Sequence, residues 1–354
     1  MNRKRIYRIM VALATVMALS ACSAMQEDRS DCPTCKNPLR IKLRYDYNLQ
    51  RADMFNDHVG AAVCYVVDGS NRIVAKQYAA NRDGNEPLKE SSFAFNFEGL
   101  AAGNYTAYAV GAQRDFSELT NFLPTDLDEG DDITGLLLRI PHATAADADG
   151  RYAVDASQPL DTIWHGVSAE PVVVEAKSPT EYTVGLVRDT KNLSIMLVQT
   201  QNPTENYAEN YEVRVADHNT LLDYQNLLAN DEALRYDPYD AWTTETLDNT
   251  NTLVERVAHY DLSFGRLFSY DQSGKNARLL INNRADGAAI VDIDLVYYLS
   301  LARNAAENRY GIQEYLDRAY DYRLDFVLVG NEWKYMTISI DVLNWSLRIE
   351  RTTL

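Results

Sequence analysis

The sequence of 354 residues has little of what enzymes and metal sites depend on. It contains 5 histidines and 4 cysteines, and the histidines are scattered without an HExxH pair. No GxSxG, GxGxxG or Walker sequence occurs. Basic residues are also scarce: 34 Lys and Arg face 51 Asp and Glu, a net charge of −17, whereas phosphate binding requires clustered basic side chains. We therefore expect no enzyme activity, cofactor, metal, small-molecule substrate or nucleic-acid partner.

Glycine and proline are few as well, at 16 and 10 residues, while tyrosine is frequent, at 23 residues. Aromatic residues are favoured in strands, so this balance indicates β-sheet. Hydrophobic residues make up 46% of the chain, which is enough to bury a core and excludes wholesale disorder. At about 100–200 residues per domain, the length suggests two domains.

The N-terminus lacks a long apolar run but carries the parts of an export signal. Four basic residues fall within the first eight positions, and the apolar run Ile9–Ala18 follows. This run is too short for a bilayer, which takes about 20 residues. Leu19-Ser20-Ala21-Cys22 then has the form of a bacterial lipobox. We predict a lipoprotein signal peptide over residues 1–21 and lipidation of Cys22; the alternative is an ordinary signal peptide that happens to contain a cysteine.

The predicted mature chain is strongly acidic. Removal of residues 1–21 takes away four basic and no acidic residues, which leaves 30 − 51 = −21. Such a chain is not attracted to anionic lipid, so membrane attachment must come from acyl chains, at about 0.8 kcal/mol per buried CH₂. Residues 22–37 are polar and acidic and are predicted to form the lipidated tether.

The remaining cysteines suggest no redox or zinc site. Cys32 and Cys35 form a CxxC in the predicted tether, not at the start of a helix in a βαβ unit, where a redox pair would lie. No further zinc ligands are nearby. With Cys22 acylated, Cys32, Cys35 and Cys64 are odd in number, so we expect one disulfide and one free thiol, without knowing which pair forms.

Alternation of apolar and polar residues predicts strands along most of the chain. The clearest is Leu39–Tyr47, and the continuous apolar run Ala61–Val67 suits the interior of a sandwich. Further strands are predicted over Phe93–Phe97, Tyr105–Val110, Pro171–Ala176, Tyr182–Val187, Leu193–Val198, Tyr211–Ala216, Ala277–Ile281, Ala289–Leu299, Leu324–Leu328, Met336–Val342 and Trp345–Ile349.

Helices are predicted to be few and short. One is expected over Leu221–Leu228, with Asn219 as its N-cap, and one over Ile312–Ala319. Residues 143–158 are predicted to be a loop. The pattern favours an all-β chain of two tandem β-sandwich domains with short helices in connections. We place the domains at residues 38–180 and 181–354.

Several segments together resemble the fimbrillin-associated anchor lipoproteins, the minor subunits of type V fimbriae in Bacteroidota. Their order and spacing cover nearly the whole mature chain, although the resemblance does not explain Cys35 and Cys64. The matching segments are the lipobox ending at Cys22, Asp31-Cys32-Pro33, Leu39–Tyr47, Leu160–Gly166, Leu186–Leu193, Gln313–Arg318 and the strands around Trp333 and Trp345.

This resemblance implies two transthyretin-like β-sandwiches and a lipid anchor in the outer membrane, with the protein exposed at the cell surface. It implies fimbrial shaft or accessory subunits as partners, joined by strand exchange, and no catalysis. His165 then has a structural role at a strand edge, packed between sheets.

The C-terminal strand is the candidate for exchange. Trp345, Leu347 and Ile349 alternate with polar residues, as a strand added to another subunit's sheet requires. The resemblance points the same way, because C-terminal strands are the donors in that family. The alternative is that this strand belongs to the chain's own second sandwich.

Two other functions stay open at this stage. A stalk or tip pilin of the same system is cut after an arginine in the first strand, where Arg40 and Arg44 lie. A surface glycan-binding lipoprotein is possible because tandem β-sandwiches with exposed aromatics suit sugar stacking.

Overall fold

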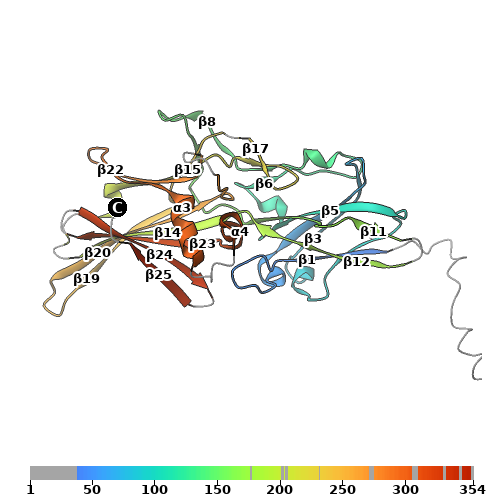
Figure 1. The fold of residues 1–354 in the computed structure, drawn as a ribbon, viewed down its shortest axis with the longest axis horizontal. Coiled ribbons are helices and arrows are strands. Elements are labelled where there is room, and N and C mark those ends of the chain that lie inside the picture. Colours follow the sequence, from blue (N-terminus) through green and yellow to red (C-terminus); the bar gives the residue numbers. More distant parts are fainter. Residues whose placement is uncertain are drawn as a thin grey trace, which may run out of the picture.

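The fold is built from strands, as the alternation predicts. A computed structural model describes residues 38–175, 178–200, 203, 206–230, 232–270, 275–304, 310–329, 332–342 and 345–351. They form two β-sandwiches that follow one another along the long axis (Figure 1). No helix among these residues is long and apolar enough to cross a membrane. The helices and 3-10 turns are α2 (Phe55–His58), α3 (Leu295–Leu301), α4 (Ile312–Arg318), η2 (Pro87–Lys89), η3 (Phe116–Glu118), η4 (Ile133–Gly135), η5 (Ala208–Asn210) and η6 (Ala302–Asn304).

The smaller sheet of the first sandwich holds the first described strand at its centre. β1 (Leu39–Arg44) runs parallel to β12 (Thr180–Gly185) and antiparallel to β4 (Phe95–Phe97). Leu39 and Ile41 are fully buried, while Arg40 and Lys42 are partly exposed. The half-buried strand predicted over Leu39–Tyr47 is therefore confirmed over Leu39–Arg44, and Tyr45–Tyr47 lie beyond its end.

The larger sheet of the first sandwich is covered on both faces. Every residue of its strand β2 is buried: Cys64 lies in the core shared with the small sheet, and Tyr65 lies in a second core that continues into the other half of the molecule. This is why the sequence of β2 is apolar throughout. The strand order is β13 (Val187–Arg188), β10 (Ile163–Val167), β5 (Gly103–Ala112), β2 (Ala61–Val67) and β3 (Ile73–Ala80), with β11 (Val172–Val174) also paired to β5.

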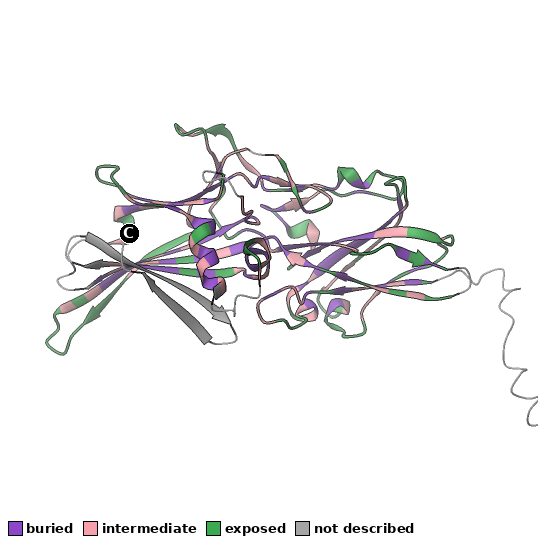
Figure 2. Ribbon diagram, viewed as in Figure 1, coloured by how far each residue is buried: buried purple, intermediate pink, exposed green. Residues whose placement is uncertain are grey.

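The second sandwich has two six-stranded sheets whose inner residues, such as Ile195 and Val215, share one buried cluster (Figure 2). The first sheet has the order β19 (Asp240–Leu247), β20 (Leu253–Phe264), β14 (Lys191–Thr200), β23 (Asp321–Val329), β24 (Glu332–Val342) and β25 (Trp345–Arg351). The second has the order β22 (Ala289–Asp294), β21 (Arg278–Asn283), β15 (Tyr211–Asp217), β18 (Leu234–Tyr236), β9 (Tyr152–Val154) and β8 (His142–Ala146).

The two halves of the chain also exchange strands. β9 runs parallel to β18, so the predicted loop over residues 143–158 contains strand that completes the second sandwich. The first sandwich's own strands continue to Arg188, the end of β13. The predicted domain ranges 38–180 and 181–354 stay a prediction. A small antiparallel sheet with strands from both halves also joins them, in the order β17 (Leu228–Asn230), β16 (Leu221–Leu222), β7 (Leu138–Arg139) and β6 (Leu123–Pro124).

The helix predicted over Leu221–Leu228 is wrong, because a turn between β16 and β17 occupies this segment. The Asp223 carboxylate accepts hydrogen bonds from the backbone N–H groups of Gln225 (2.9 Å) and Leu227 (2.9 Å). Asn226 adopts a positive φ of 60°, which asparagine tolerates better than most residues. Leucines at helical spacing therefore lie in a hairpin whose turn chemistry overrides the spacing.

The strand predicted over Ala289–Leu299 is half right. β22 ends at Asp294, whose side chain accepts a hydrogen bond from Tyr297 N (2.8 Å) and caps α3. The cap satisfies an N–H that the first turn of a helix otherwise leaves free. The helix predicted over Ile312–Ala319 is confirmed by α4.

Candidate functional site

The N-terminal end of β1 lies at the end of the molecule farthest from the second sandwich (Figure 1). The carbonyl of Pro38 accepts a hydrogen bond from Thr180 N (3.0 Å), and Leu39 pairs with Thr180 and Phe97. Cys22, the predicted lipidation residue, precedes this strand and lies outside the described residues. A tether that ends at Pro38 therefore joins the folded part at this end.

The three candidate donor residues lie together in β25. Trp345, Leu347 and Ile349 are at alternate positions and so share one face of the strand. Among the strands that the structure describes, β25 pairs with β24 alone. It lies at the edge of its sheet, in the half of the molecule opposite to the start of β1 (Figure 1). Edge strands present unpaired backbone N–H and C=O groups, which makes them the usual place for pairing with another chain.

A buried charge network lies where the two sandwiches meet. The guanidinium of Arg266, which follows β20, donates two hydrogen bonds to the Asp317 carboxylate on α4, at 2.7 and 2.8 Å. The fully buried Lys191, at the start of β14, donates through Nζ to the carbonyls of Asp317 (3.0 Å) and Ala319 (2.9 Å). The network thus ties α4 to the start of β14.

The same network reaches the segment that links the sandwiches. Asn226 donates through Nδ2 to Asp189 Oδ1 (2.9 Å), and Arg266 donates through Nη1 to the Asn226 carbonyl. Burial raises the pKa of Asp189 and lowers the pKa of Lys191, because removal from water disfavours both charged forms. Asp189 N also donates to the carbonyl of Ile163 in β10 (2.9 Å).

Cation–π contacts join the loop after β1 to the segment around α4. The Arg318 guanidinium lies 4.0 Å from the ring centroid of Tyr47 and 4.9 Å from that of Tyr310. Arg51 Nε donates to the Tyr310 hydroxyl (2.6 Å). Such contacts add about 0.5–2 kcal/mol each, more where they are desolvated. The strand that follows the tether is therefore connected directly to the second sandwich.

Breaking this network should be costly. We expect Arg266→Ala to lower the free energy of unfolding by about 3–5 kcal/mol, because it leaves the buried Asp317 carboxylate without its guanidinium. The matched control is Arg278→Ala, which removes a cross-strand pair with Asp292 whose side chains are 37% and 50% exposed. Exposed pairs contribute about 0–1 kcal/mol. Urea unfolding of both variants compares the two losses, and equal losses would contradict a special role for the junction.

His165 lies inside a sheet, between β13 and β5, and not at a strand edge. Burial and the positive charge of Arg266 lower the pKa of His165 to about 3, so its imidazole stays neutral at physiological pH. Its Nε2 has no hydrogen-bond partner among the described residues. A Cβ on the neighbouring Gly166 would lie 2.6 Å from the Gly185 carbonyl, so close packing accounts for this motif.

Cys64 is a buried free thiol. Burial raises its pKa, which keeps it protonated and makes it unreactive. This agrees with the expectation of one free thiol. Cys32 and Cys35 lie outside the described residues, and their pairing stays a prediction.

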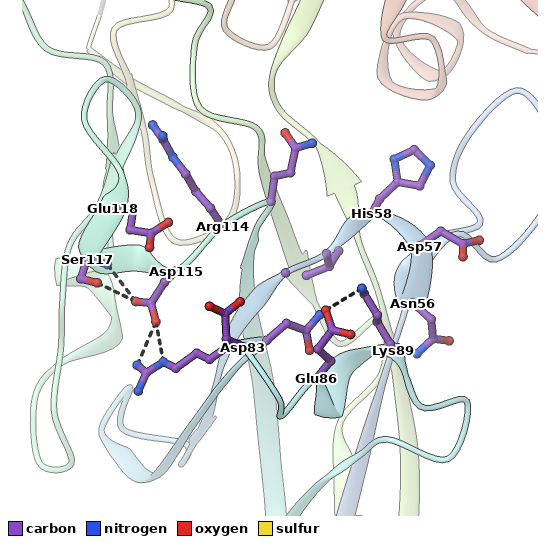
Figure 3. Close-up of a pocket in the computed structure, with 15 residues that line it drawn as sticks. Asn56, Asp57, His58, Asp83, Glu86, Lys89, Arg114, Asp115, Ser117 and Glu118 are labelled. Carbon is purple, nitrogen blue, oxygen red and sulfur yellow. Dashed lines mark hydrogen bonds and ion pairs between the residues drawn. The ribbon is translucent and has the colours of Figure 1, made fainter.

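A polar pocket of about 820 Å³ lies at the junction-side end of the first sandwich, between α2, η2 and η3 (Figure 3). Its central acid, Asp115, accepts hydrogen bonds from Ser117 N (3.1 Å) and Oγ (2.9 Å) and from Arg82 Nε (3.0 Å) and Nη2 (2.8 Å). Burial alone would raise the pKa of Asp115, but the bonds from Ser117 and Arg82 hold it at about 2. Asp115 is thus ionised at neutral pH, and its carboxylate is held by hydrogen bonds from Ser117 and Arg82.

The other charges of this pocket do not form a catalytic arrangement. Lys89 donates to Glu86 (2.6 Å), and Ser117 and His58 lie on opposite sides of the pocket (Figure 3). A serine nucleophile needs a base within hydrogen-bond reach. Nor do the described residues contain a group of three or more His, Cys, Asp or Glu side chains that could hold a metal ion.

The junction charges were missed by the sequence reasoning. Their one local signal is the run Arg188-Asp189-Thr190-Lys191 between two apolar strands. A solvated loop has the same pattern, so the signal is not specific. Arg266 and Asp317 carry no signal, because long-range folding brings them together.

Comparison with known proteins agrees with this description. The model of the family described as fimbrillin-A associated anchor proteins Mfa1 and Mfa2 matches residues 29–350. A search of curated proteins gives no match. Solved structures from Bacteroides thetaiotaomicron share the fold. One, described as a "putative adhesin", is 24% identical over 90% of this chain and 99% of its own, with a TM-score of 0.71.

A second, described as "putative polysaccharide binding proteins", is 25% identical over 89% of this chain and 98% of its own, with a TM-score of 0.68. The fimbrial anchor protein Mfa2 of Porphyromonas gingivalis is 14% identical over 89% of this chain and 99% of its own, with a TM-score of 0.59. The family model covers nearly the whole chain, whereas the 14% identity shows likeness of fold alone. The chain belongs to the family of fimbrillin-A associated anchor proteins.

Proposed function

We propose that this protein is a lipid-anchored minor fimbrial subunit that attaches a type V fimbria to the outer membrane. In this proposal Cys22 carries the acyl chains, and β25 joins the protein to a shaft or accessory subunit by strand exchange. Family membership supports a role among fimbria-associated anchors and adhesins. That role requires binding and mechanical strength rather than catalysis.

The observation that carries the proposal is the placement of the two candidate attachment points. The tether joins the first sandwich at Pro38, at one end of the long axis, and β25 lies in the second sandwich (Figure 1). A linker between a membrane and a filament needs its two attachments well separated. It also needs a stiff connection between them, and the buried pair of Arg266 and Asp317 supports that stiffness.

The placement of β25 supports the exchange step. Its residues pair with β24 from Trp345 to Arg351, and its other edge has no partner among the described strands. A terminal strand held by one neighbour can leave its own sheet at lower cost than an inner strand, since only one ladder of hydrogen bonds breaks. An acceptor sheet on another subunit would replace that ladder.

A second candidate function is that of a stalk or tip pilin cleaved after an arginine of β1. β1 lies between β12 and β4, so its removal would open a groove lined by buried apolar residues. On this strand Arg40 is partly exposed and Arg44 is exposed. This placement makes the cleavage worth testing.

Intact-mass measurement of the protein purified from the cell surface separates the two. The anchor role predicts a chain that begins at Cys22 and carries the added mass of acyl chains. A chain that begins after Arg40 or Arg44 would instead support the pilin. Co-purification with a fimbrial shaft is expected in either case, and its absence would contradict both.

A further inference from the structure

The outer face of the β19–β20–β14–β23 sheet carries a hollow that neither attachment point uses. Cross-strand register places Trp242 next to His259 and His259 next to Met196, with Asp261 next to Ser194 one row along. These residues alternate with the buried core residues, so they share the outer face. The hollow measures about 580 Å³, within the ~300–1,000 Å³ typical of small-ligand sites.

An aromatic platform borders the hollow. Trp242 is 40% exposed on β19, a strand that is exposed along most of its length (Figure 2). Its ring stacks on that of His259, with centroids 4.8 Å apart and planes 2° from parallel. Thr244 Oγ1 holds the imidazole through Nε2 (2.8 Å). The indole is therefore held in one orientation, with much of its surface open to a ligand.

Hydrogen-bonding groups of both kinds surround this platform. Asp261 accepts a hydrogen bond from the Ser194 hydroxyl through one carboxylate oxygen (2.6 Å). Asp321 likewise accepts one from the Asn192 amide (2.6 Å). Within the described part of the chain, the second oxygen of each has no hydrogen-bond partner. Arg323 donates through Nε to Asp325 (2.9 Å) and through Nη2 to Met196 (3.2 Å), and its Nη1 has no hydrogen-bond partner among the described side chains.

Tyr239 completes the set as a donor. Burial, then the nearby carboxylates of Asp261 and Asp240, raise its pKa, so its hydroxyl stays protonated at neutral pH. Burial and Arg323 lower the pKa of His259 below 6.5, so the platform itself carries no charge. Acceptors, donors and a neutral ring thus converge on one hollow.

The presence of acceptors, donors and a neutral aromatic ring in one hollow favours some classes of ligand over others. An anion would meet the carboxylates of Asp261 and Asp321, and a cation would meet the guanidinium of Arg323. A neutral molecule rich in hydroxyl groups satisfies both kinds of partner, since each hydroxyl donates and accepts. Its weakly positive C–H groups suit the negative face of the indole.

We propose that this hollow binds a neutral glycan, with one sugar ring stacked on Trp242 and its hydroxyls bonded to Asp261, Asp321 and Arg323. The site is separate from the proposed anchor function, because its described lining residues lie on β14, β19, β20 and β23 and just before β19. An anchor with such a site would hold a surface polysaccharide beside the base of the fimbria.

The test uses the full chain purified from cells. It is screened against neutral gluco-, manno-, galacto- and xylo-oligosaccharides, sialylated and sulfated oligosaccharides, and acidic and basic peptides, and each hit is titrated calorimetrically. We expect at least one neutral oligosaccharide to bind. Trp242→Ala should weaken that binding at least about tenfold. The matched control is Tyr297→Ala on α3, which removes an aromatic ring that is 48% exposed elsewhere.

Asp261→Asn gives a second, milder variant, because an amide oxygen still accepts from Ser194 while the charge is lost. We expect Asp261→Asn to weaken binding about fivefold to tenfold. If the melting temperature shows that Trp242→Ala does not fold, the affinity of Asp261→Asn tests the proposal in its place. The proposal is overturned if no neutral oligosaccharide binds, or if charged glycans or peptides bind instead. An equal loss in Tyr297→Ala, or wild-type affinity in the folded Trp242 and Asp261 variants, overturns it as well.

Discussion

Replacement of Cys22 by alanine is expected to move the protein almost completely from the outer-membrane fraction to the soluble fraction. Without the thiol no acyl chain is added, and each buried CH₂ contributes about 0.8 kcal/mol to attachment. The predicted mature chain has a net charge near −21, so attraction to anionic lipid does not replace that attachment. Fractionation followed by immunoblotting measures the effect, and labelling with a radioactive fatty acid measures lipidation directly.

The matched control is Cys35→Ala, which removes another cysteine of the same predicted tether. It should leave fractionation and labelling unchanged, since the lipobox depends on Cys22 alone. A Cys22 variant that still sediments with the outer membrane as fully as the wild type would remove the basis of the anchor proposal. Loss of attachment in both variants would point to misfolding or degradation rather than to lipidation.

Deletion of residues 345–354 is expected to abolish capture of the fimbrial shaft while the protein stays folded and membrane-bound. β25 is held by β24 alone among the described strands, so its loss removes one edge of one sheet. Capture is measured by co-purification with the shaft, and folding by the thermal melting temperature.

Point variants of the same strand separate the exchange role from a simple loss of chain. Leu347→Asp places a charge on the apolar face of the strand and should reduce capture as strongly as the deletion. Ser346→Asp places the same charge on the opposite face and should leave capture close to the wild type. Wild-type capture by the truncated protein would end the donor hypothesis, and failure of that protein to fold would make β25 part of this chain's own core.

Local patterns predicted the elements well where a single period governs them. The alternation of Leu39–Tyr47 follows from the geometry of a strand, in which side chains point to opposite faces, so it identifies β1 without knowledge of its partners. The apolar run of β2 likewise shows burial on both faces. α4 follows from the spacing of Ile312, Tyr315 and Leu316.

The predictions of secondary structure failed where a few local hydrogen bonds outweigh the spacing of the apolar residues. Leu221–Leu228 has leucines at helical spacing, but Asp223 and Asn226 form a turn that a helix does not allow. In Ala289–Leu299 apolar residues lie on both sides of Asp294, so the distribution of apolar residues does not mark the change from strand to helix. The helix α3 begins at the Asp294 cap, and in the sequence Asp294 is one of two acidic residues, with Asp292, that nothing local tells apart.

The sequence by itself determined the β class, and it predicts the export signal and the lipobox at Cys22, because each depends on residues that are adjacent or a fixed period apart. Only the tertiary structure decided which strands meet: β9 joins the second sandwich, β1 lies at the centre of its sheet, and Trp242 lies in the hollow with Asp321. Strand register and crossing connections set those neighbours over separations that no local pattern encodes. The buried contact of Arg266 with Asp317 has the same origin. These residues lie far apart in the sequence, and only folding brings them together and excludes water around them.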